Sequence, residues 1–238
     1  MYAGSASSLV RVPPTSSPPD ALSLLIVGSP ELPASTRERV KATSPGWTLP
    51  PSDAARAEVR AIASLFEERA VTTLSGTAAT EASLRARMGS ASILHVAAPF
   101  RMNGASPLFS PILLSPDSVA PDPPADNDGV LEMREVMNLD LRARVAVLSD
   151  GASASMRDAA PSADTVRWAW RASGVPSIVL SRWRVDDAAV TSMLKELYAR
   201  LKDGEAPDTA LQGARTAVRA AEATRAPYFW AGWMVVGR

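Results

Sequence analysis

The chain has 238 residues, 46% of them hydrophobic and 21% charged, and its formal net charge is zero. This length and composition suit one sizeable globular domain, or one domain with a tail. Without net positive charge nothing attracts a polyanion, so we expect neither nucleic acid nor membrane as a partner. No apolar run reaches the roughly 20 residues of a membrane span, and we expect a cytoplasmic protein.

The chain contains no cysteine and a single histidine, His95. The lack of cysteine excludes disulfides, thiol nucleophiles and thiolate metal sites. One imidazole does not make a zinc site. We therefore expect no metal and no other cofactor.

Residues 1–20 are rich in serine and proline and predict a flexible leader without the basic and apolar regions of a signal peptide, followed by one domain over 21–238. In chain order, short apolar runs predict buried strands at 24–28, 71–74, 92–97, 112–114, 145–149, 177–180 and 229–236. Capping residues and helical periodicity predict helices at 52–69, 80–88, 132–138, 164–173, 186–202 and 208–225, the last capped by Asp208. Residues 30–51 form a proline-rich connection.

Strands and helices alternate along the whole chain. This pattern predicts an α/β fold with a mostly parallel sheet and helices on both faces. Functional sites in such folds form at the carboxyl ends of strands. The segments to inspect therefore follow Gly28, Ala97, Ser149 and Leu180.

Two glycine-containing turns resemble ligand loops only superficially. Gly28-Ser29-Pro30 lacks the second glycine and the lysine of a phosphate loop. Asp128-Gly129 with Glu135 has the spacing of a calcium loop, but Pro124 stands at the first ligand position. Asp-Gly pairs are also frequent in tight turns, and we interpret both segments as turns.

Histidine and serine are the remaining candidates for catalysis. His95 lies within an apolar strand, where a hydrogen-bonded core residue is the expected role. Ser149, Ser153 and Ser155 lie near a strand end and could act as nucleophiles, but a hydroxyl needs a base within hydrogen-bond reach. A serine-based active site stays open as the less favoured alternative.

Two acidic residues follow the strand at 177–180, in the segment Trp183-Arg184-Val185-Asp186-Asp187. Capping the next helix is the favoured role of this pair. The alternative is that the carboxylates hold a basic side chain.

Several segments, in the same order and spacing, are similar to the motifs of one known family. They are 49–63, 76–84, 93–97, 110–114, 128–141, 145–149, 181–187, 208–217 and 228–232. On these segments the chain resembles the CHAT domain, a bacterial, caspase-like member of the caspase and separase peptidase clan (clan CD), often associated with tetratricopeptide repeats. The resemblance covers roughly residues 20–238 and implies a caspase-like three-layer sandwich.

The catalytic positions of the family are the main departure. The resemblance places Pro99 where the family has its base and Gly151, after Asp150, where it has its cysteine nucleophile. His95 is four residues upstream, about 13 Å along an extended strand, too far to replace the base. A vestigial cleft is expected at Pro99, Asp150, Gly151, Ser181, Trp183, Asp186 and Asp187.

These departures predict a pseudopeptidase, a catalytically inactive CHAT domain that serves as a protein-interaction or regulatory module. Its expected partner is a protein or peptide, with helical repeats upstream if the chain belongs to a longer protein. Two alternatives remain: a hydrolase with a non-cysteine nucleophile near 149–155, and a small-ligand or nucleotide sensor.

Overall fold

The computed structural model describes residues 22–43, 47–49, 52–117, 127–149, 159–183 and 185–237. The expected leader lies outside these ranges. The strands are β1 (Leu24–Pro30), β2 (Val71–Gly76), β3 (Ile93–Ala97), β4 (Pro111–Leu113), β5 (Val130–Glu132), β6 (Val145–Leu148), β7 (Ser177–Ser181) and β8 (Trp233–Gly237). The α-helices are α1 (Ala34–Thr43), α2 (Ser52–Ala63), α3 (Glu81–Met88), α4 (Met133–Val136), α5 (Ala159–Ala172), α6 (Asp187–Lys202), α7 (Pro207–Ala220) and α8 (Pro227–Trp230). Short 3-10 helices in the described ranges are η2 (Glu68–Ala70), η3 (Pro107–Phe109) and η5 (Glu222–Thr224).

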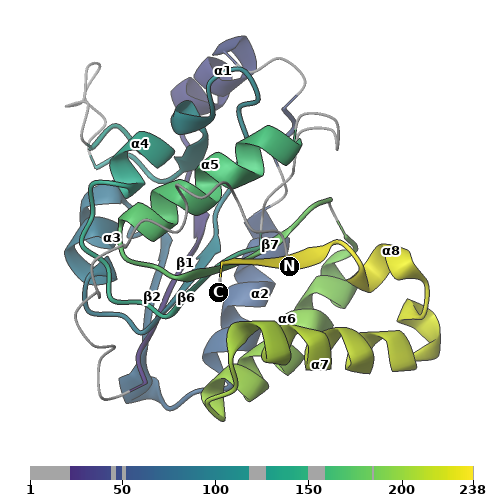
Figure 1. The fold of residues 1–238 in the computed structure, drawn as a ribbon. Coiled ribbons are helices and arrows are strands. Elements are labelled where there is room, and N and C mark those ends of the chain that lie inside the picture. Colours follow the sequence, from purple (N-terminus) through teal and green to yellow (C-terminus); the bar gives the residue numbers. More distant parts are fainter. Residues whose placement is uncertain are drawn as a thin grey trace, which may run out of the picture.

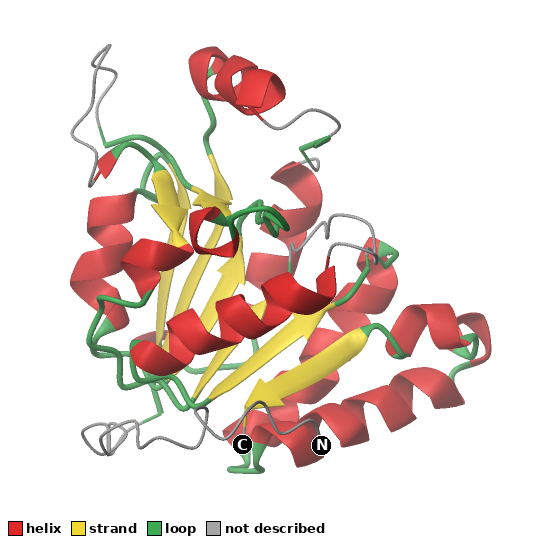
Figure 2. Ribbon diagram, turned by 45° about the horizontal axis from the view of Figure 1, so that its top comes forward, coloured by secondary structure: helices red, strands yellow, loops and turns green. Residues whose placement is uncertain are grey.

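The central sheet of the described chain has six strands in the order β2-β1-β3-β6-β7-β8. All neighbours are parallel except β7 and β8, which pair antiparallel. A separate two-stranded hairpin pairs β4 with β5. The parallel strands run toward α1, and helices cover both faces of the sheet (Figures 1 and 2). The expected three-layer α/β sandwich, with a mostly parallel sheet, is confirmed.

Both faces of the sheet are buried, which explains why its strands read as continuous apolar runs. Successive side chains of a strand point to opposite faces. In β1, Leu25 and Val27 therefore join the core under α3, α4 and α5, whereas Leu24 and Ile26 join the core under α2, α6 and α7. Each layer of helices thus has its own hydrophobic core.

The expected connection over residues 30–51 is wrong in one respect, because it contains α1. This helix buries little: Val40 packs with Leu32 and Leu113 in a small third cluster. A helix without an apolar stripe has no periodic signal in the sequence.

The C-terminal predictions also need correction. The strand expected at 229–236 begins only at Trp233, because Pro227 starts the short helix α8 at its first position. Asp208 does not cap α7: the N-cap is Ala206, Pro207 follows it, and the Asp208 carboxylate accepts from the backbone N–H of Thr209. Strand β5 was not expected at all.

None of the helices in the described ranges is long and apolar enough to cross a membrane.

Candidate functional site

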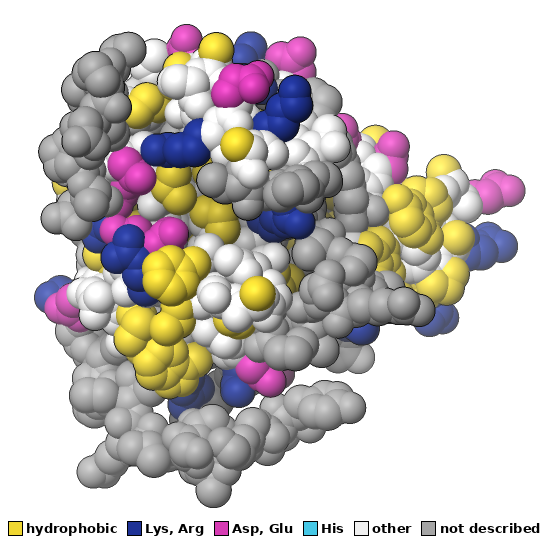
Figure 3. Space-filling view, turned by 90° about the horizontal axis from the view of Figure 1, so that it is seen from above, with side chains coloured by type: hydrophobic (Ala, Val, Ile, Leu, Met, Phe, Trp, Pro, Cys, Tyr) yellow, Lys and Arg dark blue, Asp and Glu magenta, His cyan; other side chains and the backbone are white. Residues whose placement is uncertain are grey.

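The carboxyl ends of β3, β6 and β7 lie side by side, because these strands are parallel neighbours. Val96 pairs with Leu148, and Leu148 pairs with Leu180. The segments that follow these residues therefore leave the sheet at one edge, as expected for a site of this fold class. Figure 3 looks onto this side of the molecule.

Pro99 occupies the segment after β3 and is buried. Its carbonyl accepts a hydrogen bond from the backbone N–H of Leu113 at 2.8 Å, and Phe100 bridges to Ile112. The β4–β5 hairpin therefore packs against the segment where a catalytic base would be expected. A proline side chain carries no group that exchanges protons.

The segment after β6 is described only through Ser149; the predicted site residues Asp150 and Gly151 lie outside the described residues, as do Ser153 and Ser155. The backbone N–H of Ser149 donates to the carbonyl of Val96 at 3.1 Å. Its hydroxyl donates to the same carbonyl at 3.4 Å. Among the described residues, the contact of this hydroxyl is with the backbone of β3.

His95 is fully buried between the sheet and the helices α2 and α6, which confirms the expected core role. Its Nε2 lies 2.9 Å from Glu58 Oε1, and its Nδ1 lies 2.9 Å from the Tyr198 hydroxyl. Burial, together with the charge of Glu58, raises the pKa of Tyr198 well above its usual value, so this phenol stays neutral and can donate. Both ring nitrogens of His95 are therefore engaged inside the core.

Ser181 and Trp183 form a tight turn after β7. The Ser181 hydroxyl donates to the carbonyl of Trp183 at 2.5 Å, and the indole Nε1 of Trp183 donates to the carbonyl of Tyr228 at 2.9 Å. Gly232 lies against the indole, where an added Cβ would stand only 2.7 Å from Trp183 Cε2. The half-buried Trp183 is thus held by α8 and the turn that follows it.

Asp186 caps α6, the role that the sequence favours for it. Its Oδ1 accepts from the backbone N–H groups of Ala188 and Ala189 at 3.0 and 3.4 Å. Asp187 follows in the first turn and is exposed, where its charge complements the positive end of the helix dipole.

The structure brings Pro99, Ser181, Trp183, Asp186 and Asp187 to the carboxyl side of β3 and β7.

Within the described residues, no group of three or more histidine and acidic side chains could hold a metal ion. Asp128-Gly129 forms a turn, with Gly129 at φ +81°, and Glu135 is engaged elsewhere. The interpretation of this segment as a turn is therefore supported.

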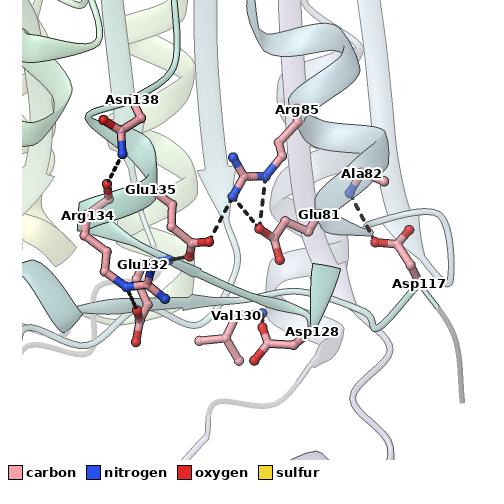
Figure 4. A network of polar contacts seen from close by, with 10 residues as sticks. All are labelled: Glu81, Ala82, Arg85, Asp117, Asp128, Val130, Glu132, Arg134, Glu135 and Asn138. Atoms are coloured by element: carbon pink, nitrogen blue, oxygen red, sulfur yellow. Dashed lines mark hydrogen bonds and ion pairs between the residues drawn. The ribbon is translucent and has the colours of Figure 1, made fainter. Parts of the chain in front are cut away.

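A second buried polar cluster was missed by the sequence analysis. Arg85 of α3 lies between Glu81 of the same helix and Glu135 of α4 (Figure 4). The first pair has the i,i+4 spacing typical of helical ion pairs and could have been found in the sequence. Glu135 is 50 residues further along the chain, and no sequence pattern indicated its contact.

Hydrophobic side chains are exposed at several places on the described surface. The large ones are Leu108, Phe109, Trp168 and Tyr228. Figure 3 shows that hydrophobic side chains gather in two separate places on the side it presents, with charged side chains nearby. Tyrosine and tryptophan are frequent anchors of protein interfaces.

Comparison with known proteins adds two findings. The family model of the CHAT domain matches residues 1–238. Tetratricopeptide repeat protein 28 from Homo sapiens is 22% identical to this chain over 259 aligned residues, which cover 98% of the chain and 10% of that protein. The chain thus spans about a tenth of the length of this relative. Because the family model matches the whole chain, the chain belongs to the CHAT domain family.

Proposed function

We propose that this chain is a catalytically inactive CHAT domain that binds a protein or peptide partner at the carboxyl ends of β3, β6 and β7. Binding there would regulate the partner or assemble it with other proteins, without cleavage. The proposal includes a cytoplasmic location and a place in a longer protein with helical repeats, of the kind for which the human relative is named.

The observation that carries the proposal is that His95 is engaged in the core and is not available as a catalytic base. The only histidine of the chain has both ring nitrogens hydrogen-bonded inside the core, and Pro99, which the resemblance aligns with the family's base, is buried. The chain also contains no cysteine. Peptide hydrolysis by this clan needs a cysteine thiol and a base that accepts the thiol's proton, which leaves a nucleophilic thiolate.

The geometry after β7 supports a role in binding. Trp183 is fixed by its hydrogen bond to the Tyr228 carbonyl and by its contact with Gly232. A half-buried, rigid tryptophan offers apolar area at little entropic cost, which is the usual property of an interface anchor. Asp186 and Asp187 follow it in the sequence, are exposed, and favour a partner with a basic side chain.

Cleavage of a broad peptide library tests the loss of activity. The natural chain is compared with a repaired version that carries Pro99→His and Gly151→Cys, and with each single substitution as a control. We expect no cleavage by the natural chain. Cleavage that survives repurification and is abolished by Ser149→Ala or Asp150→Ala would overturn the proposal in favour of a hydrolase.

Binding is tested with peptides selected on the natural chain from a random display library. Trp183→Ala should lower the affinity for the selected peptides at least tenfold, as expected for an anchor residue. Lys202→Ala is the matched control, because Lys202 ends α6 at the opposite edge of the sheet and contacts the Leu65 carbonyl. Equal affinities for the natural chain and Trp183→Ala would place the binding surface elsewhere.

A further inference from the structure

One guanidinium serves two buried carboxylates on different helices (Figure 4). Arg85 donates to Glu81 Oε1 through Nε at 3.0 Å and Nη2 at 2.6 Å, and the same Nη2 donates to Glu135 Oε1 at 3.1 Å. The Glu81 side chain is 0% exposed and that of Glu135 is 8% exposed. The cluster therefore holds one positive and two negative charges if both acids are ionised.

The charged side chains around the cluster do not offset its excess of negative charge. Asp128 adds negative potential at Glu81, and its own cationic partner, Arg39, is 3.9 Å away with a side chain that is 45% exposed. Asp117 accepts from the backbone N–H of Ala82, so its carboxylate also lies at the start of α3. The neighbouring Arg134 is paired with Glu132 at 2.5 Å. The surroundings of Glu81 are thus predominantly acidic.

Within this cluster, Glu81 is the carboxyl group that the excess of negative charge affects most. Its Oε2 is buried and has no hydrogen-bond partner within the described residues. Burial raises the pKa of Glu81 to about 7, with Glu135 and Asp128 adding to the rise and Arg85 opposing it. Glu81 is therefore a buried acid whose proton is released near neutral pH.

The cluster joins α3 to the β4–β5 hairpin and α4. Glu135 Oε2 accepts from the backbone N–H of Glu132, the last residue of β5, at 2.9 Å. At the other end of the hairpin, Ser115 bridges to Thr80, the N-cap of α3. The hairpin is thus attached to α3 at both of its ends, and the cluster supplies the charged attachment.

We propose that Glu81, Arg85 and Glu135 form a proton-dependent clasp that fastens the β4–β5 hairpin and α4 to α3. With Glu81 protonated, Arg85 neutralises Glu135 and the clasp is closed. Loss of the proton leaves an uncompensated negative charge in a buried position, which favours opening because an open Glu81 is hydrated.

The direction of the pH effect follows from the proton balance. The closed state holds the Glu81 proton up to about pH 7, whereas an open, hydrated Glu81 releases it from its ordinary pKa of 4.5. The closed state is therefore favoured most in acid. Its advantage decreases as pH rises from about 4.5 to about 7 and is constant above that.

Amide hydrogen exchange measured between pH 5 and 8, and corrected for the intrinsic rate, tests the clasp. The reporters are the hairpin amides that donate outside the hairpin: Ser115 donates to the carbonyl of Ala79, just before α3, and Leu113 donates to the carbonyl of Pro99. We expect their protection to fall at least fivefold over this range while the amides of β3 keep theirs. Glu81→Gln, which cannot ionise, should abolish the fall, and Glu205→Gln, at the more exposed pair with Arg200, should not.

Three results would overturn the proposal: protection that does not change with pH in the natural chain, an equal fall in Glu81→Gln, or an equal fall in β3. Should Glu81→Gln fail to fold, the side-chain carboxyl of Glu81 can be followed directly by carbon-13 NMR in the natural chain. Titration near 7 that is coupled to the hairpin amides supports the clasp. Titration near 4.5 overturns it.

Discussion

Replacing Tyr198 by phenylalanine tests how much the buried network around His95 stabilises the fold. An ionised Glu58 only accepts hydrogen bonds, so Nε2 of His95 donates to it, and Nδ1 is left to accept from the Tyr198 hydroxyl. Tyr198→Phe keeps the ring, including its edge-to-face contact with Phe66, and removes only that hydroxyl. The substitution therefore isolates one hydrogen bond.

The expected loss follows from burial. His95 and Tyr198 are both 0% exposed, so water does not replace the lost donor at Nδ1. Leaving a buried acceptor unsatisfied costs about 1–3 kcal/mol. For a domain of this length, each kcal/mol lowers the melting temperature by roughly 2–4 °C.

Urea unfolding followed by circular dichroism measures the loss. Tyr228→Phe is the matched control: Tyr228 is 52% exposed, and we expect its substitution to change stability by less than about 0.5 kcal/mol. A double-mutant cycle with His95→Phe should give a coupling energy of about 1 kcal/mol or more between the two positions. A loss for Tyr198→Phe no larger than that for Tyr228→Phe would refute the reasoning.

Three further substitutions probe the packing and the proposed site. Gly28→Ala places a Cβ 2.7 Å from Val59 Cγ2, so we expect a loss of about 1–3 kcal/mol in urea unfolding, partly restored by Val59→Ala. Asp186→Ala removes the cap from α6 and should cost about 1 kcal/mol, whereas Asp186→Asn, which can still cap, should cost clearly less. Gly232→Ala drives a methyl into the Trp183 indole and should weaken peptide binding along with Trp183→Ala, whereas unchanged affinity would show that the position of this indole does not matter for binding.

Elements with an apolar signal were predictable from the sequence. The buried runs of β1, β3, β6 and β7 gave strands close to the observed bounds, and Thr80 caps α3 as expected. Helix α1 lacks an apolar stripe, and the three residues of β5 are too few for a periodic pattern. Such elements form because the rest of the fold provides a surface for them.

The site was predictable only in part, for a related reason. That segments after β3 and β7 share an edge followed from the α/β pattern, and the capping role of Asp186 followed from its position before a helix. The contacts of His95 could not be predicted, since its partners Glu58 and Tyr198 are 37 and 103 residues away in sequence. Side-chain contacts at that separation depend on how the layers pack.

Glu58, His95 and Tyr198 are joined by two hydrogen bonds in series, which matters when active sites are identified from the geometry of side chains. A carboxylate, an imidazole and a hydroxyl in series are what a Ser-His-Asp triad presents, with the phenol in the place of the serine. A template search based on distances alone would select this core as a hydrolase centre. Solvent access separates the two cases, because no substrate carbonyl can reach a hydroxyl that is 0% exposed. A buried carboxylate, imidazole and hydroxyl in series should therefore be taken as a hydrolase centre only when the hydroxyl reaches the surface.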